Sequence, residues 1–291
     1  MCDKIRGRAV VESLAKRFPQ LYVAPAEGAQ DTNRLAATRG MVPEGANLDH
    51  FASDPEDTLY STDTPAGPVE TVFLKNRSDF ETFLRIIGNK SMPVEIARTV
   101  GAITYRGIPD WGAVACAREE YLANGGDDWA SEFARLASTP GSFRAELVVV
   151  SEGPYSNVSA SMTRYSEEEW LRISREIRLH HECAHVVCRR LLPDDVLPVW
   201  DEVTADVVGL LCATGEYDAH LAALFLGVTA NGFSGGRLSE YLDDEALGRI
   251  DAIAIEVHAA LRDIEGMCGN AESSDPFGFL VRLKETPLVT L

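Results

Sequence analysis

The sequence predicts a long amphipathic helix that begins at Ser166. The segment Ser166-Glu167-Glu168-Glu169 has the form of a capping box, in which the Ser and the last Glu side chains satisfy free backbone amides at a helix start. Apolar residues then recur at helical spacing and form one stripe: Trp170, Ile173, Ile177, Ala184, Val187 and Leu191. A helix with such a face must pack against a core, so we expect the fold to be organised around it.

Two histidines lie on this helix within the motif His181-Glu182-Cys183-Ala184-His185. Residues four apart share a helical face, so His181 and His185 can bind one metal ion together. Glu182 lies about 100° around the helix, where it can act as a base at an open position of the metal. His181 falls within the apolar stripe, and unpartnered buried imidazoles cost about 1–3 kcal/mol each, which a metal ion would offset. The alternative is a structural histidine pair without metal.

A second helix, predicted from about Pro198 to Thr214, supplies two carboxylates on one face. Glu202 is the candidate third ligand, since two imidazoles, one carboxylate and an open position are typical of catalytic metal sites. Asp206, four residues later, is placed to accept a hydrogen bond from the outer N–H of a ligand histidine. The alternative is that both are solvated carboxylates of an acidic protein.

Together these motifs resemble the thermolysin-type zinc metallopeptidases, the gluzincins, whose pattern is H-E-x-x-H followed by a helix carrying E-x-x-x-D. The resemblance covers about residues 166–215. It implies the following roles: zinc ligands His181, His185 and Glu202, general base Glu182, and a carboxylate behind the ligands at Asp206.

The chain departs from the gluzincin pattern at Asp201, where the thermolysin group has Asn. The histidine and tyrosine that those peptidases direct at the oxyanion are not evident in the sequence. The segments Gly101–Tyr105 and Gly153–Ser156, taken with the motif, also resemble a bacterial family of unassigned function.

The predicted fold is α+β and zincin-like, with a mixed α/β N-terminal part (1–165), a mainly helical C-terminal part (166–291) and the active cleft between them. Residues 25–68 are rich in Gly, Pro, Asp and Thr without periodicity, so a long irregular segment is expected there. Residues 145–151 form the clearest strand. The gluzincin resemblance implies that this is an edge strand that pairs with an extended substrate; the alternative is an ordinary buried strand.

The predicted function is hydrolysis of a peptide or amide bond by a zinc site. Glu182 would take the proton of the attacking water and pass it to the leaving nitrogen. The same ligands form the facial triad of non-haem Fe(II) oxygenases, so an Fe²⁺-dependent modifying enzyme of biosynthetic metabolism is the alternative. A third interpretation is a non-catalytic binding protein that keeps the metal for stability.

Hydrolysis also needs a donor for the developing oxyanion. Four side chains are candidates: His220, Arg237, Tyr241 and His258. Arg237 and Tyr241 rank first, because the preceding glycine-rich segment can bring them close to the metal. Arg237 is also suited to bind a substrate carboxylate in a bidentate manner. The neighbours of the first ligand, His180 and Cys183, are not expected to bind metal.

The composition of the chain limits the classes of partner that it can bind. The formal net charge of −18 argues against nucleic acid and against anionic membrane surfaces, and 45% hydrophobic residues suffice for a substantial core. No apolar run is long enough for a transmembrane helix. The six scattered cysteines contain no C-x-x-C, which favours reduced thiols in a cytoplasmic protein. We therefore expect a small-molecule or peptide substrate; the sequence carries no signal for an oligomeric state.

Overall fold

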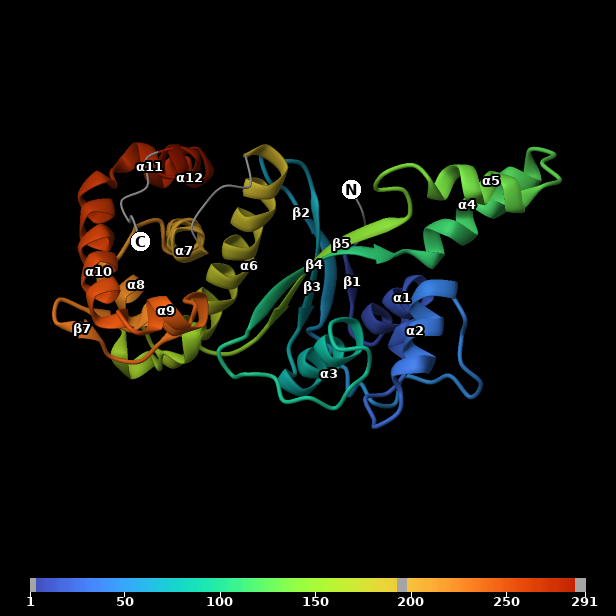
Figure 1. The fold of residues 1–291 in the computed structure, drawn as a ribbon, viewed down its shortest axis with the longest axis horizontal. Coiled ribbons are helices and arrows are strands. Elements are labelled where there is room, and N and C mark those ends of the chain that lie inside the picture. The colour runs from blue at the N-terminus through green and yellow to red at the C-terminus, as the bar shows by residue number, and fades with distance from the viewer. Residues whose placement is uncertain (1–3, 193–197, 286–291) are drawn as a thin grey trace. The chain divides into compact units, whose positions relative to one another are not determined.

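A computed structural model describes residues 4–192 and 198–285 of the chain (Figure 1). Helices and strands occur together, so the predicted α+β class is confirmed. The chain divides into two compact units. The first comprises the chain up to Thr62, together with Val69–Ile96 and Thr104–Ser151. The second comprises Asp63–Pro68, Ala97–Ile103 and the chain from Glu152 onward.

The first unit is built on a five-stranded sheet with the order β1-β2-β3-β5-β4. The strands are β1 (Ile5–Arg6), β2 (Thr58–Thr62), β3 (Val69–Leu74), β4 (Ala102–Pro109) and β5 (Arg144–Ser151). The two pairs β1–β2 and β2–β3 are antiparallel, whereas β3 and β5 are parallel, with Val72 opposite Val149. Five helices accompany this sheet: α1 (Ala9–Arg17), α2 (Gln30–Arg39), α3 (Arg77–Ile87), α4 (Trp111–Ala123) and α5 (Trp129–Ala137).

The prediction that residues 145–151 form an edge strand is wrong. β5 lies between β3 and β4, and β4 occupies that end of the sheet. Leu147, Val148 and Val149 are fully buried. A continuous apolar run is typical of an interior strand covered on both faces, and a strand paired on both sides has no free backbone groups to offer a substrate.

The prediction of one irregular segment over residues 25–68 is also wrong, because it contains α2 and β2. α2 is anchored by a polar contact: the buried Asn33 amide donates to the Ile86 carbonyl at 3.0 Å. Polar anchors leave no hydrophobic period in the sequence, so a search for apolar periodicity does not find such a helix.

The second unit is mainly helical, and the boundary predicted at 165/166 falls inside it. Its helices are α6 (Glu167–Leu191), α7 (Pro198–Thr214), α8 (Ala219–Leu226), α9 (Asp244–Leu247), α10 (Ile250–Met267), α11 (Asn270–Ser274) and α12 (Pro276–Glu285). A short hairpin joins β6 (Val228–Thr229) to β7 (Gly232–Phe233). Among the described residues, no helix is long and apolar enough to cross a membrane.

The core of the second unit forms around α6 and α7, and α7 also packs against α12 (Figure 1). Trp170 on α6 and Trp200 on α7 are almost completely buried. The two helices approach closely where Ile177 meets Gly209, because a Cβ atom on this glycine would lie 2.9 Å from the Ile177 carbonyl oxygen. Contacts pair later residues of α6 with earlier residues of α7, so the helices are antiparallel. This packing places the H-E-x-x-H motif of α6 opposite Glu202 and Asp206 of α7.

Candidate metal centre

Helix α6 begins with the predicted capping box. The Ser166 hydroxyl accepts from the Glu169 amide, and the Glu169 carboxylate accepts from the Ser166 amide at 3.0 Å. The helix then runs without interruption to Leu191, so His181 and His185 lie one turn apart on the same face. His181 is 6% exposed, and His185 is partly buried.

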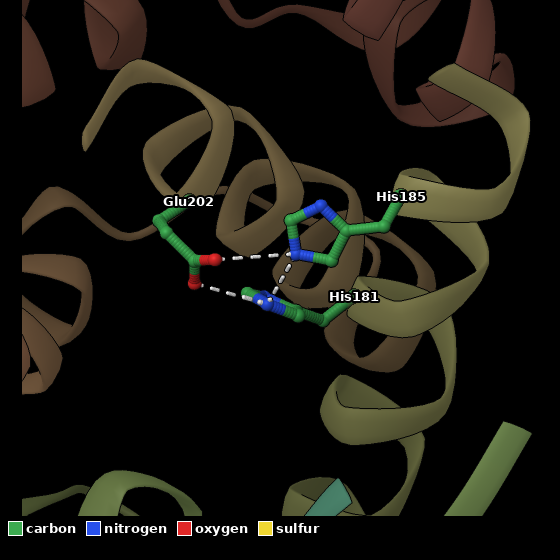
Figure 2. Close-up of side chains that lie close together, drawn as sticks. All are labelled: His181, His185 and Glu202. Carbon is green, nitrogen blue, oxygen red and sulfur yellow. Dashed lines mark hydrogen bonds and ion pairs between the residues drawn. The ribbon is translucent and has the colours of Figure 1, made fainter. Parts of the chain in front are cut away.

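Glu202 on α7 faces both histidines (Figure 2). The Nε2 atoms of His181 and His185 are 3.0 Å apart. Glu202 Oε2 lies 3.3 Å from Nε2 of His181, and Oε1 lies 3.4 Å from Nε2 of His185. Four ligands arranged tetrahedrally at about 2.0–2.1 Å from one ion would be separated by about 3.3 Å. The observed triangle therefore has the dimensions of three ligands around one small ion.

The outer nitrogens of both histidines contact carboxylates. His181 Nδ1 lies 2.8 Å from Asp206 Oδ1, and His185 Nδ1 lies 2.8 Å from Asp201 Oδ2. An ionised carboxylate only accepts hydrogen bonds, so both Nδ1 atoms carry the proton. When both rings are neutral, as metal binding requires, the Nε2 lone pairs point toward each other and toward Glu202. This donor set fits a metal cation, which would bind two imidazole nitrogens and one carboxylate.

The charges of these groups depend strongly on one another. Burial by itself lowers the pKa of His185, but hydrogen bonds to Asp201 and Glu202 outweigh it and raise the pKa to about 10. Burial by itself raises the pKa of Glu202, but hydrogen bonds from both histidines hold it well below its ordinary value. Asp201 behaves in the same way, with His185 as the main cause of its lowered pKa. The carboxylates therefore stay ionised.

Asp206 is the most heavily hydrogen-bonded carboxylate of the site. Its side chain is 1% exposed. Besides His181, its Oδ1 accepts from the Tyr155 hydroxyl at 2.5 Å, and its Oδ2 accepts from Arg237 Nη2 at 2.5 Å. Burial raises the pKa of Asp206, but the charge of Arg237 more than compensates and the pKa is lowered. Asp206 thus holds His181 in orientation and is itself held by two further side chains.

Arg237 is positioned by a close contact between glycines. Gly227, at the end of α8, has a φ of +70°, and a Cβ atom there would lie 2.2 Å from the carbonyl oxygen of Gly235. The chain then passes through Gly236 into the buried Arg237. Arg237 Nη1 donates to the Tyr241 hydroxyl at 3.2 Å and lies 3.8 Å from Glu202 Oε2. Arg237 and Tyr241 therefore belong to the network around the three candidate ligands.

A pocket of about 260 Å³ opens onto these residues. Its lining includes both histidines, Glu202 and the three residues predicted to take part in catalysis, Glu182, Arg237 and Tyr241. The other walls come from Thr99–Ile103, Tyr155, Ser156 and Arg178. All of these residues belong to the second unit.

Other candidates from the sequence lie outside this cluster. His220 and His258 line a separate pocket between α8 and α10, together with Arg262. Among the described residues, the group that can hold a metal includes neither His180 nor Cys183. Cys183 is fully buried, and burial raises the pKa of its thiol to about 12, so it is a poor ligand.

Three residues around the site do not follow from the sequence. The sequence marks Asp201 only as a departure from a family pattern, although its position before Glu202 is a usable signal. Tyr155 lies within Gly153–Ser156, where the sequence offers only a family resemblance, yet it donates to Asp206. Lys284 on α12 pairs with Asp201. The two residues are 83 positions apart along the chain, so no local sequence pattern connects them.

The chain belongs to a family of unknown function, DUF7005, whose model matches residues 2–277. The matched stretch contains every residue of the centre except Lys284. Comparisons with curated proteins and with solved structures gave no match.

Proposed function

We propose that this member of the DUF7005 family is a zinc-dependent hydrolase of a peptide or amide bond. The observation that carries the proposal is the triangle of His181 Nε2, His185 Nε2 and the Glu202 carboxylate, with separations of 3.0–3.4 Å. Both outer nitrogens have carboxylate partners, as ligand histidines usually do. Three protein ligands leave a coordination position for water or substrate.

Glu182 is the proposed general base, because it lines the same pocket and follows the first ligand directly on α6. Zinc bound here would lower the pKa of its water toward 7 and polarise a substrate carbonyl. Glu182 would accept the proton of the attacking water and return it to the leaving nitrogen. Tyr241 and Arg237, on the same pocket wall, are the proposed donors to the developing negative charge.

The gluzincin relationship is part of this proposal. It is supported by the antiparallel pair α6 and α7, on which H-E-x-x-H faces Glu202 and Asp206. We propose that a zincin-like arrangement extends to these two helices. The strand that would accompany substrate in such a fold is not β5, for the reason given above.

The first test is elemental analysis of protein purified without added metal, with His181→Ala as the control. We expect about one zinc per chain in the wild type and none in the variant. Iron in place of zinc would contradict the hydrolase proposal and support the Fe²⁺ oxygenase interpretation. Absence of metal from both proteins would overturn the metal centre itself.

The second test distinguishes whether Glu182 acts as the general base or as a metal ligand. Glu182→Gln is expected to retain zinc but to lose hydrolytic turnover on a peptide and amide panel, while His185→Ala loses the zinc. Loss of zinc from Glu182→Gln would show that Glu182 is a ligand and would refute the assigned roles.

A further inference from the structure

A second pocket in the helical unit lies between α8 and α10. Its volume is about 450 Å³, and among the described residues it shares no lining residue with the pocket at the metal centre. Its wall contains His220 and His258, two histidines that the sequence singles out but that do not belong to the metal centre. A concave site of this size with a few polar groups is typical of small-molecule binding sites.

Three nitrogen-bearing side chains converge on this pocket. His258 and Arg262 are four residues apart on α10, so they project from the same face of the helix. Glu265, on that face, accepts a hydrogen bond from the Ala219 amide at 3.0 Å, which brings the start of α8 and therefore His220 beside them. His220 is exposed, the Arg262 side chain is 68% exposed and His258 is half-buried, so a ligand from solution can reach all three.

These side chains suit an anion rather than a metal ion. Among the described residues, the group of three ligand atoms that lie close enough to share a metal ion is that of His181, His185 and Glu202. An imidazole carries an N–H donor whether it is neutral or protonated, and a guanidinium carries five. Arg262 Nε lies 3.8 Å from Glu265 Oε2, which is too long for a hydrogen bond. The pocket therefore offers donors from three side chains to an oxygen anion.

The charge of the pocket fits a ligand with one negative charge. Of the described lining residues, Arg262 and Glu265 are an arginine and a carboxylate, and the other polar ones are imidazoles and hydroxyls. One carboxylate can pair with the Arg262 guanidinium in a bidentate manner, whereas a second negative charge would face Glu265 without a second arginine or lysine in this described lining. The formal net charge of the chain, −18, also repels a dianion more strongly than a monoanion.

The rest of the wall is mainly apolar. Met162 is 52% exposed, so a ligand that covers it removes apolar surface from water. The hydroxyls of Thr229 and Ser234 donate to backbone carbonyls, at 2.9 and 3.1 Å, and their protons are therefore already used. The apolar side chains of the lining are Met162, Ala219, Ala223, Leu224 and Val228. A ligand with an apolar body and one anionic end matches this wall.

We propose that this pocket is a second ligand site, which binds a small monocarboxylic acid with an apolar body. The carboxylate pairs with Arg262 and accepts hydrogen bonds from His220 and His258, and the apolar body lies against Met162 and Leu224. The inference does not depend on the proposed hydrolase function, since the two pockets have no described residue in common.

The test compares four probes on the full chain as purified, by NMR titration of the histidine imidazole signals. Hexanoate carries both features of the proposed ligand, acetate carries only the carboxylate, hexanamide only the apolar body, and inorganic phosphate a second negative charge. We expect hexanoate to shift the signals of His220 and His258 and to bind about ten-fold more tightly than each of the other three probes. Spectra of His220→Gln and His258→Gln assign the two signals.

A matched pair of arginine variants locates the carboxylate. Arg262→Met removes the charge from an exposed side chain and keeps its apolar bulk, so hexanoate affinity should fall about ten-fold while hexanamide affinity is unchanged. The control is Arg249→Met, which removes the same charge from an exposed arginine at the other end of α10, outside the described lining. Its hexanoate affinity should stay within about two-fold of the wild type.

The outcomes decide the inference independently of the metal centre. Shifts at His220 and His258 that Arg262→Met weakens and Arg249→Met preserves support the site. Hexanoate that shifts only His181 and His185 binds at the metal centre and overturns it, and so does an equal loss of affinity in both arginine variants. Phosphate or hexanamide binding as tightly as hexanoate overturns the ligand class. Zinc content and hydrolysis are measured separately, so the proposed function stands or fails on its own tests.

Discussion

The two histidines of the centre are held by aspartates in very different surroundings. The His181 and Asp206 side chains are 7% and 1% exposed, and Asp206 also accepts from Tyr155 and Arg237. In the second pair, the His185 and Asp201 side chains are 13% and 35% exposed, and the further partner is Lys284. The first pair is enclosed and multiply bonded, whereas water reaches the second.

This difference assigns different tasks to the two aspartates. Asp206 is a structural centre of the second unit as well as a support for a candidate ligand, since removing it would leave the buried Arg237 with only the 3.8 Å contact to Glu202. Asp201 supports its histidine in a partly hydrated place, where solvent can replace part of a missing carboxylate, although the Lys284 side chain beside it is 4% exposed.

The free energy of unfolding should change most when either aspartate is removed. Asp206→Ala removes the closest counter-ion of the buried Arg237, which keeps only the longer contact to Glu202 at 3.8 Å, so the free energy of unfolding should fall by about 3–5 kcal/mol. Asp201→Ala should cost less, about 2 kcal/mol: it removes the partner of Lys284, whose side chain is 4% exposed, but solvent reaches the Asp201 position, which is 35% exposed. Urea unfolding of both variants without added metal gives the comparison. Equal losses would remove the distinction between the two pairs.

An intermediate effect is expected on zinc affinity. In Asp201→Asn, the one remaining acceptor oxygen can serve His185 Nδ1, and the amide N–H₂ then replaces the oxygen that pairs with Lys284 at this partly hydrated position. Asp206 must accept from three donors, and an Asn amide would turn its N–H₂ toward one of them. We expect zinc to bind about 100-fold more weakly to Asp206→Asn and about ten-fold more weakly to Asp201→Asn. Competition with a chromogenic chelator measures both, and the reverse order would contradict the argument.

Smaller losses of stability are expected from removing Tyr155 or Lys284, the further partners of Asp206 and Asp201. Tyr155→Phe removes one donor from Asp206 while His181 and Arg237 remain, so the unfolding free energy should fall by about 1 kcal/mol. Lys284→Met removes the partner of the half-exposed Asp201 and should cost less than about 1 kcal/mol. Thermal unfolding of each variant beside the wild type tests the ranking, which fails if Lys284→Met is the more damaging change.

Local patterns in the sequence predicted much of this site. The capping box at Ser166 set the start of α6, and helical spacing put His181 and His185 on one face. The same helical spacing placed Glu202 and Asp206 on one face of α7. Each of these inferences involves residues within one helix, where backbone geometry alone fixes relative position.

Inferences that depended on neighbours in space were less successful. The edge position expected for residues 145–151 depended on whether another strand lies beside β5, and β4 does. Apolar periodicity does not predict α2, because the residue that anchors this helix, Asn33, is polar. Tyr155 and Lys284 reach the site from other parts of the chain, so no spacing rule connects them with it.

The motifs in the sequence were therefore enough to identify which side chains come together: two imidazoles, a carboxylate and the neighbouring Glu182, on two helices. The packing of the second unit set which outer groups contact each histidine and how much water reaches each pair. This division arises because helix geometry is local and repeats along the chain. Hydrogen-bond saturation and burial, in contrast, depend on what packs nearby, and that is set by contacts between residues far apart in the chain.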